Sequence, residues 1–519
     1  MKSNADTPDT PARHRWLPTI GLSLWLIFVL ALTLSPWRLV MINADGDTCL
    51  HWRIGHWMIE HRAVLRSDVF SHTRAGAPVV TMEWLSEVVL AAAGDALGWN
   101  GIVLLVAVII ATGLWRLHRQ LLSEGSDLLL STGLTLLASF VCYVHWFARP
   151  HVISFVFLVI LGEQLWAFEQ GQVSTRQLWW RLVPLTMVWV NLHAGFLTGL
   201  MLIGIGFIGA GTGLWARSDA TRLESYRKMW SLALVGIACL IASLANPNGW
   251  RLYGYIGGFL RHAKLVSFVN EFRSPNFHSR NMSGFLLMLG GLAITLIVIR
   301  ARLQPTEVLL IGWAGCCALR WVRNVPIFAI VATPILARHL NAWLQQVPDA
   351  WLRRYREVAR NLGDLNRRAD GRWTVAIAMV LLAVVVAKPR VVGGAPILET
   401  AILTNRFPGS AVGFLRQNPR AVSGEMFNDY GWGGYLILVM PEHRVFVDGR
   451  NDFYGANLIQ DFRSVSEVHT NWEVVLHRCG VGWTILPRAH PLNELLALRS
   501  DWSVAYADDV AAIYVRKPE

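Results

Sequence analysis

Apolar runs of close to twenty residues recur along the chain and restrict it to one broad class of fold. A helix of about 20 residues crosses a hydrocarbon core about 30 Å thick. Hydrophobic residues make up 54% of the 519 positions and charged residues 16%, against about 25% charged in a soluble domain. The sequence therefore predicts a mostly α-helical, polytopic bundle of about eleven spans, near residues 16–37, 100–117, 127–146, 152–168, 180–191, 197–215, 229–245, 283–299, 306–319, 325–338 and 373–388.

Basic residues fall in alternate loops between these spans. Because cytoplasmic loops collect Lys and Arg, the N-terminus and the Arg-rich stretch 339–372 should lie in the cytoplasm, and loops 38–99 and 246–282 outside. The same rule accounts for the formal net charge of +12. No basic patch interleaved with stacking aromatics stands out, so we do not expect nucleic-acid binding.

The composition changes near residue 389, where short β-rich runs begin to alternate with helical ones. This alternation predicts a small α/β domain over 389–519, separate from a membrane domain over 1–388. Since the last span leads outward, the domain should be extracytoplasmic. The expected strands are 425–427, 444–447, 482–486 and 510–515, and the expected helices are 409–417, 458–464, 472–477 and 492–498.

The most polar segment of the first outer loop directly follows span 1 and contains Asp45, Asp47, His51 and Arg53. In an extended segment, acids two positions apart point the same way. Such a pair can take a proton from a hydroxyl or hold a divalent cation against a phosphate. Asp45-Gly-Asp47-Thr is equally typical of a helix start, so a capping turn is the alternative.

Further polar residues lie in the outer loops and at the outer ends of other spans. Each by itself is typical of an interface anchor or a helix cap. Together with the two acids they indicate a surface that binds an anionic, lipid-anchored substrate. With two residues of the polar segment, the candidate binding residues are His51, Arg53, Glu83, Arg149, His151, Asn191, His193, Lys264, Glu271, Arg273, Arg320 and Arg323.

Two segments of the C-terminal region resemble ligand loops only in part. The Gly-rich run 427–435 follows a strand and can cradle a phosphate or a sugar, but it has neither GxGxxG spacing nor a P-loop lysine. Asp448-Gly449-Arg450 follows another expected strand, and a structural turn is the favoured interpretation. The six cysteines show no CxxC spacing that would indicate zinc.

The layout resembles the GT-C superfamily of membrane glycosyltransferases. The resemblance rests on the acid after span 1, on the runs Asp47-Thr-Cys-Leu-His51-Trp-Arg53 and Glu83-Trp84-Leu85, and on residues 189–195 and 428–434, which are similar to segments of uncharacterised bacterial members. In that family the acid is a catalytic base or contacts a metal, and the role carries over to Asp45 or Asp47, with Asp47 favoured. The chain departs from oligosaccharyltransferases because it has no WWDYG-type motif.

The resemblance implies a multi-pass protein of the bacterial inner membrane that takes its sugar from a polyprenyl-phosphate-linked donor. The acceptor would be an envelope glycan, lipid or protein. No cofactor is required by the resemblance, and a divalent cation is left open. The expected partners are membrane lipids, the lipid-linked donor and the acceptor.

Two other functions compete with glycosyl transfer. A transporter or flippase for an envelope lipid or polysaccharide would show acids or broken helices near the membrane midplane, often in repeated halves. The spans here are largely free of acids at that depth, and no internal repeat is visible. A non-catalytic envelope assembly subunit would keep its activity when Asp47 is neutralised.

Overall fold

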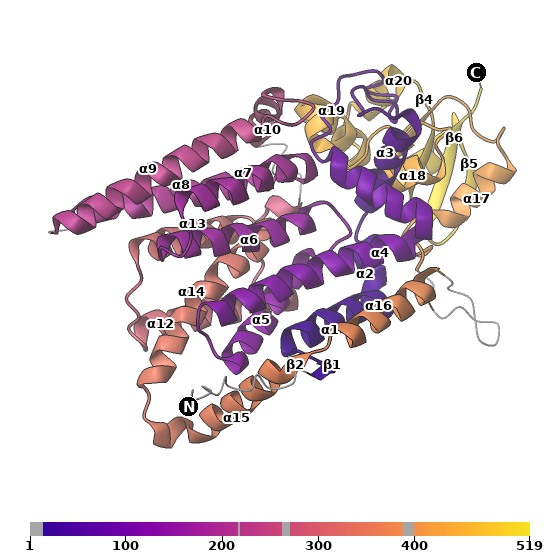
Figure 1. Ribbon diagram of the computed structural model, residues 1–519. Coiled ribbons are helices and arrows are strands. Elements are labelled where there is room, and N and C mark those ends of the chain that lie inside the picture. The colour runs from indigo at the N-terminus through magenta and orange to yellow at the C-terminus, as the bar shows by residue number, and fades with distance from the viewer. Residues whose placement is uncertain (1–13, 216–217, 262–269, 388–397, 399, 519) are drawn as a thin grey trace, which may run out of the picture.

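The computed structural model describes residues 14–215, 218–261, 270–387, 398 and 400–518. Long helices lie side by side in one part of the molecule, and a smaller α/β part is attached at one end of them (Figure 1). In the first part the helices are α1 Ile20–Leu34, α2 Trp37–Asn43, α3 Asp47–His61, α4 Trp84–Ser123, α5 Leu128–Cys142, α6 His151–Glu169, α7 Thr175–Leu192, α8 Phe196–Thr212, α9 Asp219–Ala242, α10 Arg251–Arg261, α12 Ser283–Ile297, α13 Pro305–Arg320, α14 Val325–Gln346, α15 Asp349–Arg368 and α16 Arg372–Ala387.

The helical membrane bundle is confirmed, whereas the count of eleven spans stays a prediction. Within the described residues, 7 helices are long and apolar enough to cross a membrane, or up to 8 if the bent pair α1 and α2 is one span. Each predicted span does correspond to a helix, including the shorter or more polar α7, α13 and α16. Helix α4 begins sixteen residues before predicted span 2 and includes that span, with a kink at Gly98.

The C-terminal part contains one mixed sheet. Its strands are β3 Glu425–Asn428, β4 Val481–Pro487, β5 Trp502–Ala507 and β6 Ala511–Arg516 in the order β3-β4-β6-β5, with only β3 and β4 parallel. A separate two-stranded pair joins β1 His14–Pro18 to β2 Ala369–Asp370. The C-terminal helices are α17 Gly409–Gln417, α18 Gly433–Val439, α19 Asn451–Ser466, α20 Trp472–Arg478 and α21 Pro491–Ala497.

One strand prediction is wrong, and one strand of the structure was not predicted. Residues 444–447 form no strand but make a single bridge between Val445 and Ser71 of the first loop. Strand β5, for which no strand was expected, pairs with β6 at the edge of the sheet. The predicted domain boundary near 389 falls outside the described residues.

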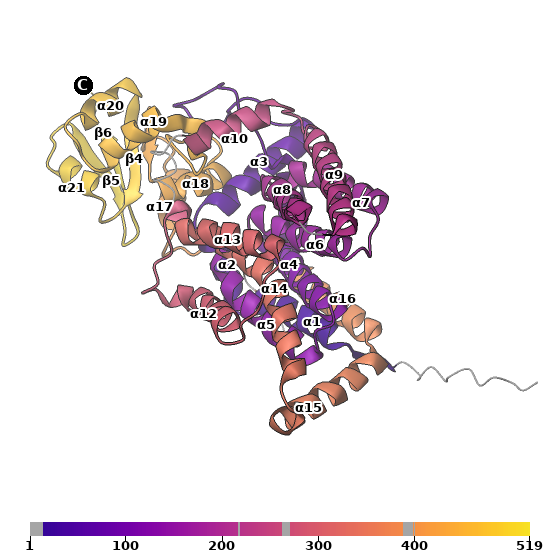
Figure 2. The ribbon, with the colours of Figure 1, turned by 90° about the vertical axis from the view of Figure 1, so that its left-hand side faces the viewer.

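The first outer loop and the C-terminal part share one hydrophobic core. Buried residues of α3 and the loop after it pack with buried residues of α18, of the segment that follows α18, and of strand β4. The first set is Cys49, Leu50, Ile54, Leu65 and Phe70, and the second is Leu436, Ile437, Met440, Val445, Trp483 and Ile485. Both ribbon views place α3 beside α18 (Figures 1 and 2). The C-terminal part is therefore fixed against the loop that carries Asp45 and Asp47.

Close backbone packing between Gly46 and Gly434 joins α3 to α18. A Cβ added at Gly434 would lie 2.2 Å from the carbonyl oxygen of Gly46, which is far inside van der Waals contact. The glycines of the Gly-rich run are thus used for chain packing.

Replacing Gly434 with Ala should destabilise the protein by about 1–3 kcal/mol, because the backbone of one helix has to move away from the other. Thermal unfolding of the purified protein measures the effect. Gly413→Ala in α17 is the matched control, because nothing lies within 4 Å of the added Cβ there. Equal unfolding temperatures for the two variants would contradict the packing role.

Candidate active site

Three carboxylates from two distant loops meet on the guanidinium group of Arg149. Its Nη1 lies 3.2 Å from Asp47 Oδ2 and 2.9 Å from Glu271 Oε1, and its Nη2 contacts Asp45. The acids at 45 and 47 lie at the start of α3, Arg149 precedes α6, and Glu271 lies in the 3₁₀ turn Asn270–Phe272. The structure thus brings together four of the residues that the sequence singled out.

Backbone hydrogen bonds hold these loops in position. Ala148 N–H donates to Met41 O over 2.9 Å, which ties the loop of Arg149 to α2. Val322 N–H donates to Arg273 O over the same distance, which ties the loop of Glu271 to the start of α14. The loops are therefore positioned by the ends of the membrane helices.

The two acids are not on an extended segment. Asp47 is the first residue of α3, and Asp45 Oδ1 accepts a hydrogen bond from Asp47 N–H over 3.0 Å. The capping-turn alternative therefore describes the local backbone, while both carboxylates still reach Arg149. In this helix His51 is four residues beyond Asp47 and shares its face, whereas Arg53 does not. Arg53 instead lies 3.5 Å from Glu60 on the outside.

Burial and neighbouring charges give the carboxyl groups of Asp47 and Glu271 different pKa values. Burial raises the pKa of Asp47 to about 6, and the nearby Glu271 and Asp448 carboxylates add to the rise against the opposing charge of His51. For Glu271, burial acts in the same direction, but Arg149 and other cations outweigh it and lower the pKa to about 2. At neutral pH, Asp47 is thus ionised but close to its proton-exchange range, which suits a general base.

A second acid–histidine group adjoins the first. His51 Nδ1 lies 3.1 Å from Glu87 Oε1, and His193 Nε2 lies 3.4 Å from Glu83 Oε1. Burial lowers the basicity of His51, but the Glu87 hydrogen bond and the neighbouring carboxylates prevail and raise its pKa to about 9. Burial also raises the pKa of Glu83 to about 7. Glu87, on helix α4, is not among the predicted site residues.

Hydrogen bonds from neighbouring groups determine which ring nitrogen of His193 carries the proton. Gly195 N–H donates to His193 Nδ1 over 2.9 Å, and Ser154 Oγ lies 2.7 Å from the same nitrogen. Since Nδ1 accepts, neutral His193 carries its proton on Nε2, where it faces Glu83. Burial and neighbouring positive charge lower the pKa of His193 well below its usual value, so the ring stays neutral.

The other predicted basic residues divide into two groups. Arg323 is half-buried, stacks over the Phe272 ring at 4.5 Å, and has no carboxylate within 4 Å among the described residues. Its charge nevertheless acts on Glu83 and Glu271, so it borders the site. Arg273 and Arg320 are exposed. Lys264 lies outside the described residues.

The side chains of two predicted binding residues form hydrogen bonds within the protein. Asn191 accepts a hydrogen bond from Trp84 Nε1 and donates to the carbonyl oxygens of Met187 and Ala245. His151 Nε2 lies 2.7 Å from His145 O. Both lie near the site but link helix ends to one another.

The C-terminal part contributes residues that sequence analysis left as a turn. A Cβ added at Gly449 would lie 2.1 Å from Asp47 Oδ1, so this backbone closes directly over the carboxylate. Arg450 next to it joins two fully buried acids, at 2.9 Å to Asp68 and 2.6 Å to Asp448. Tyr454 also donates its hydroxyl to Asp448 over 2.6 Å. This network fastens the first loop to the domain beside Asp47.

The cluster of Asp45, Asp47 and Glu271 does not fit a metal ion in this arrangement. The guanidinium of Arg149 occupies the position between Asp45, Asp47 and Glu271 where a cation would bind. Across the described residues, no group of three or more His, Cys, Asp or Glu side chains is arranged to hold a metal. We therefore derive no chemical step through a metal.

Comparison with known proteins gives a match in structure alone. No family model and no curated protein matches the sequence. The oligosaccharyltransferase AglB from Archaeoglobus fulgidus, solved with an inhibitory peptide and a dolichol-phosphate, matches with a TM-score of 0.55 and 12% identity over 90% of this chain and 69% of that chain.

Two further solved structures extend this likeness. The Archaeoglobus fulgidus oligosaccharyltransferase in complex with Zn and sulfate matches with a TM-score of 0.52 and 12% identity over 90% of this chain and 68% of that one. ArnT from Cupriavidus metallidurans, bound to undecaprenyl phosphate, matches with a TM-score of 0.52 and 14% identity over 96% of this chain and 99% of that one. AglB and ArnT are both GT-C glycosyltransferases. The chain therefore has the fold of the GT-C membrane glycosyltransferases, the superfamily that its first outer loop resembles.

Proposed function

We propose that the protein is a membrane glycosyltransferase that moves a sugar from a polyprenyl-phosphate-linked donor to an acceptor of the bacterial cell envelope. The acceptor is a glycan, a lipid or a protein. The observation that carries the proposal is the meeting of Asp47, Glu271 and Arg149 at one end of the membrane helices. The fold adds support, since two proteins that share it were solved with dolichol-phosphate and undecaprenyl phosphate.

Asp47 acts as the general base in this proposal. It takes the proton of the acceptor hydroxyl while that oxygen attacks the anomeric carbon of the sugar. The bond between that carbon and the phosphate oxygen breaks, and polyprenyl phosphate leaves with the electron pair, which inverts the anomeric configuration. Glu271 and Asp45 hold Arg149, and Arg149 limits the freedom of the Asp47 carboxylate.

Arg323 binds the donor phosphate. Arg149 is occupied by three acids, whereas Arg323 has no carboxylate within 4 Å among the residues described. A guanidinium is suited to phosphate because its planar fork donates two parallel hydrogen bonds.

Arg323→Gln should therefore raise the KM for the lipid-linked donor about ten- to a hundredfold, since a charged hydrogen bond contributes about 1.5–3 kcal/mol. Initial rates at varied donor concentration measure the change. Arg320→Gln is the control, because Arg320 is exposed at the neighbouring helix end. An unchanged donor KM in Arg323→Gln would rule out this phosphate contact.

The function is tested by following the sugar itself. Purified protein in proteoliposomes receives a polyprenyl-phosphate donor with a labelled sugar, together with envelope fractions that supply the acceptor. Glycosyl transfer leaves the label covalently attached to an acceptor and releases polyprenyl phosphate. A flippase or transporter would move the label across the bilayer with the donor intact, and that result would refute the proposal.

The membrane orientation is part of the same proposal. The Arg-rich helix α15 marks the cytoplasmic side and the C-terminal domain lies outside, in keeping with the positive-inside rule. Cysteine labelling from one side of sealed vesicles tests it: a cysteine introduced at the exposed Val504 should react only from the outside.

A further inference from the structure

A cavity of about 250 Å³ lies at the other end of the helices that carry the candidate active site. It is bordered by α6, α8, α9, α13 and α14. Helix α6 begins at His151 beside the site and ends at Glu169 in the cavity wall. At about 1.5 Å per residue, these ends are about 27 Å apart. The cavity therefore faces the leaflet opposite to the site and is independent of it.

The deep walls of the cavity are apolar. They are formed by side chains from α6, α8 and α14, namely Leu158, Val159, Leu202, Ile330 and Ile335. Leu158 precedes Glu169 by three helical turns, so the apolar part extends about 16 Å from the helix end toward the membrane centre. Apolar cavities of about 150 Å³ stay dry and take up apolar molecules. These walls therefore suit a hydrocarbon chain.

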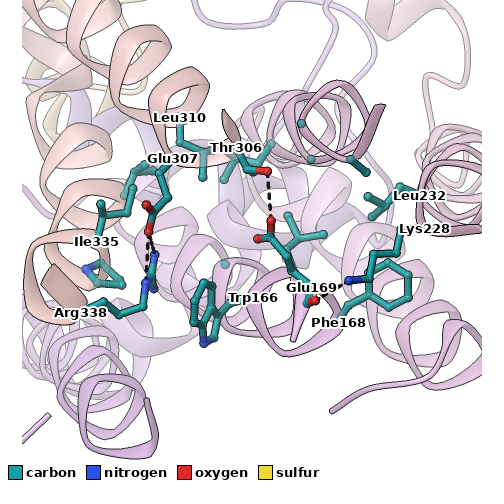
Figure 3. Close-up of a pocket in the computed structure, with 18 of the residues that line it drawn as sticks. Trp166, Phe168, Glu169, Lys228, Leu232, Thr306, Glu307, Leu310, Ile335 and Arg338 are labelled. Carbon is teal, nitrogen blue, oxygen red and sulfur yellow. Dashed lines mark hydrogen bonds and ion pairs between the residues drawn. The ribbon is translucent and has the colours of Figure 1, made fainter. Parts of the chain in front are cut away.

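The mouth of the cavity carries charged groups that differ in how well they are paired (Figure 3). Arg338 bonds to Glu124 at 2.7 Å and to Glu307 at 3.0 Å, and it stacks over Trp166. Glu307 is also 2.9 Å from His339 Nε2. Both Arg338 and Glu307 are therefore already engaged by protein side chains.

Glu169 is different because it has no cation on its carboxylate. Its Oε1 accepts the Thr306 hydroxyl over 3.1 Å, and no Lys, Arg or His of the described chain lies within 4 Å of the carboxylate. Lys228 lies beside it but donates to the Glu169 backbone oxygen at 2.8 Å and to Glu224 at 2.7 Å. Figure 3 shows the Glu169 carboxylate bonded to Thr306 and the Lys228 ammonium bonded to the Glu169 backbone oxygen, both beside apolar side chains of the cavity wall.

We propose that this cavity binds an aminophospholipid of the leaflet opposite to the active site. Its primary ammonium group pairs with Glu169, and one acyl chain fills the apolar space. Its phosphate receives a hydrogen bond from the third N–H of Lys228, because the contacts with Glu224 and the Glu169 backbone oxygen use only two of the three donors. The two side chains lie at the right depth, since Glu169 ends α6 and Lys228 precedes the apolar part of α9. An ammonium bonded to a carboxylate is a charge-assisted pair, which is stronger than a neutral hydrogen bond.

The charge requirement is tested by native mass spectrometry of the whole protein in detergent. Phosphatidylethanolamine or phosphatidylglycerol with the same acyl chains is added, and bound adducts are counted. Phosphatidylethanolamine should bind about tenfold more tightly, and Glu169→Gln should abolish that preference. Glu357→Gln on the exposed face of α15 is the control and should keep it. Equal binding of both lipids to the unaltered protein, or a preference that survives in Glu169→Gln, would overturn the proposal.

A second variant tests the cavity without touching a charge. Gly162 lines the cavity, and a Cβ added there meets nothing within 4 Å, so Gly162→Leu can place its side chain in the apolar space. It should lower binding of both lipids about tenfold or more. Gly204→Leu in α8 is the matched control, because its Cβ is equally unobstructed and it does not line the cavity. Wild-type lipid binding in Gly162→Leu would refute occupation of this cavity. Since binding is measured directly, the result does not depend on glycosyl transfer.

Discussion

Asp47→Asn should lower kcat about a thousandfold while the protein stays folded. The amide has nearly the same shape as the carboxylate but cannot accept the acceptor proton, and a general base contributes about 10²–10⁴-fold. The pH profile should change as well. Because the pKa of Asp47 is raised to about 6, kcat/KM in the unaltered protein should fall tenfold per pH unit below about 6, where the protonated acid has no base function.

The measurement is sugar transfer from a labelled polyprenyl-phosphate donor in proteoliposomes, over pH 5 to 8. Asp461→Asn is a matched control at a partly exposed pair with Arg478. Asp45→Asn should cause a smaller loss, since Asp45 supports Arg149 and the backbone of Asp47. If the Asp47→Asn protein were active and the Glu83→Gln protein inactive, the general base would be Glu83 and not Asp47.

Arg450→Met should destabilise the protein by about 3–5 kcal/mol. The substitution leaves Asp68 and Asp448 buried without their cation, and an uncompensated buried charge costs about that much. Both carboxylates have side-chain exposures of 0%, so water cannot replace the lost partner. The loss separates the first loop from the C-terminal domain, and activity should fall with stability because Gly449 covers Asp47.

Denaturant unfolding in detergent measures this stability change. Arg463→Met is the matched control, since Arg463 forms an exposed pair with Glu467 in the same helix and should change stability by about 0.5 kcal/mol or less. Adding Asp68→Asn to Arg450→Met removes one of the stranded charges and should restore part of the stability. If the Arg450→Met and Arg463→Met proteins unfold at the same denaturant concentration, the ion pairs of Arg450 with Asp68 and Asp448 do not hold the first loop against the C-terminal domain.

The sequence predicted the parts of the site that depend on where membrane helices end. Arg149 and Glu271 could be found because charged residues beside apolar spans are few and must lie at the surface. Asp47 was found for the same reason, although its helical backbone was expected only as an alternative. His51 lies with Asp47 because their spacing of four matches one helical turn, and Arg53 falls on another face.

What the sequence could not predict is contact between segments that are distant in the chain. Gly449 and Arg450 read as a turn, because nothing local shows that Asp47 and Asp68 lie against them. Glu87 was not singled out, because nothing local shows that α3 buries it and that it bonds to His51. The residues 444–447 were expected to be a strand from their composition, but the first loop supplies their single bridging partner.

The shared core between α3 and α18 has a consequence for biosynthesis. Leu50 leaves the ribosome several hundred residues before Leu436, so at about 5–20 residues per second its partner surface arrives about 20–80 s later. During that interval α3 can pack against α4, but the apolar side chains that face α18 have no partner. A nascent chain of this kind needs a chaperone or the lipid surface as a temporary cover, and truncation before residue 436 would leave these side chains accessible to proteases.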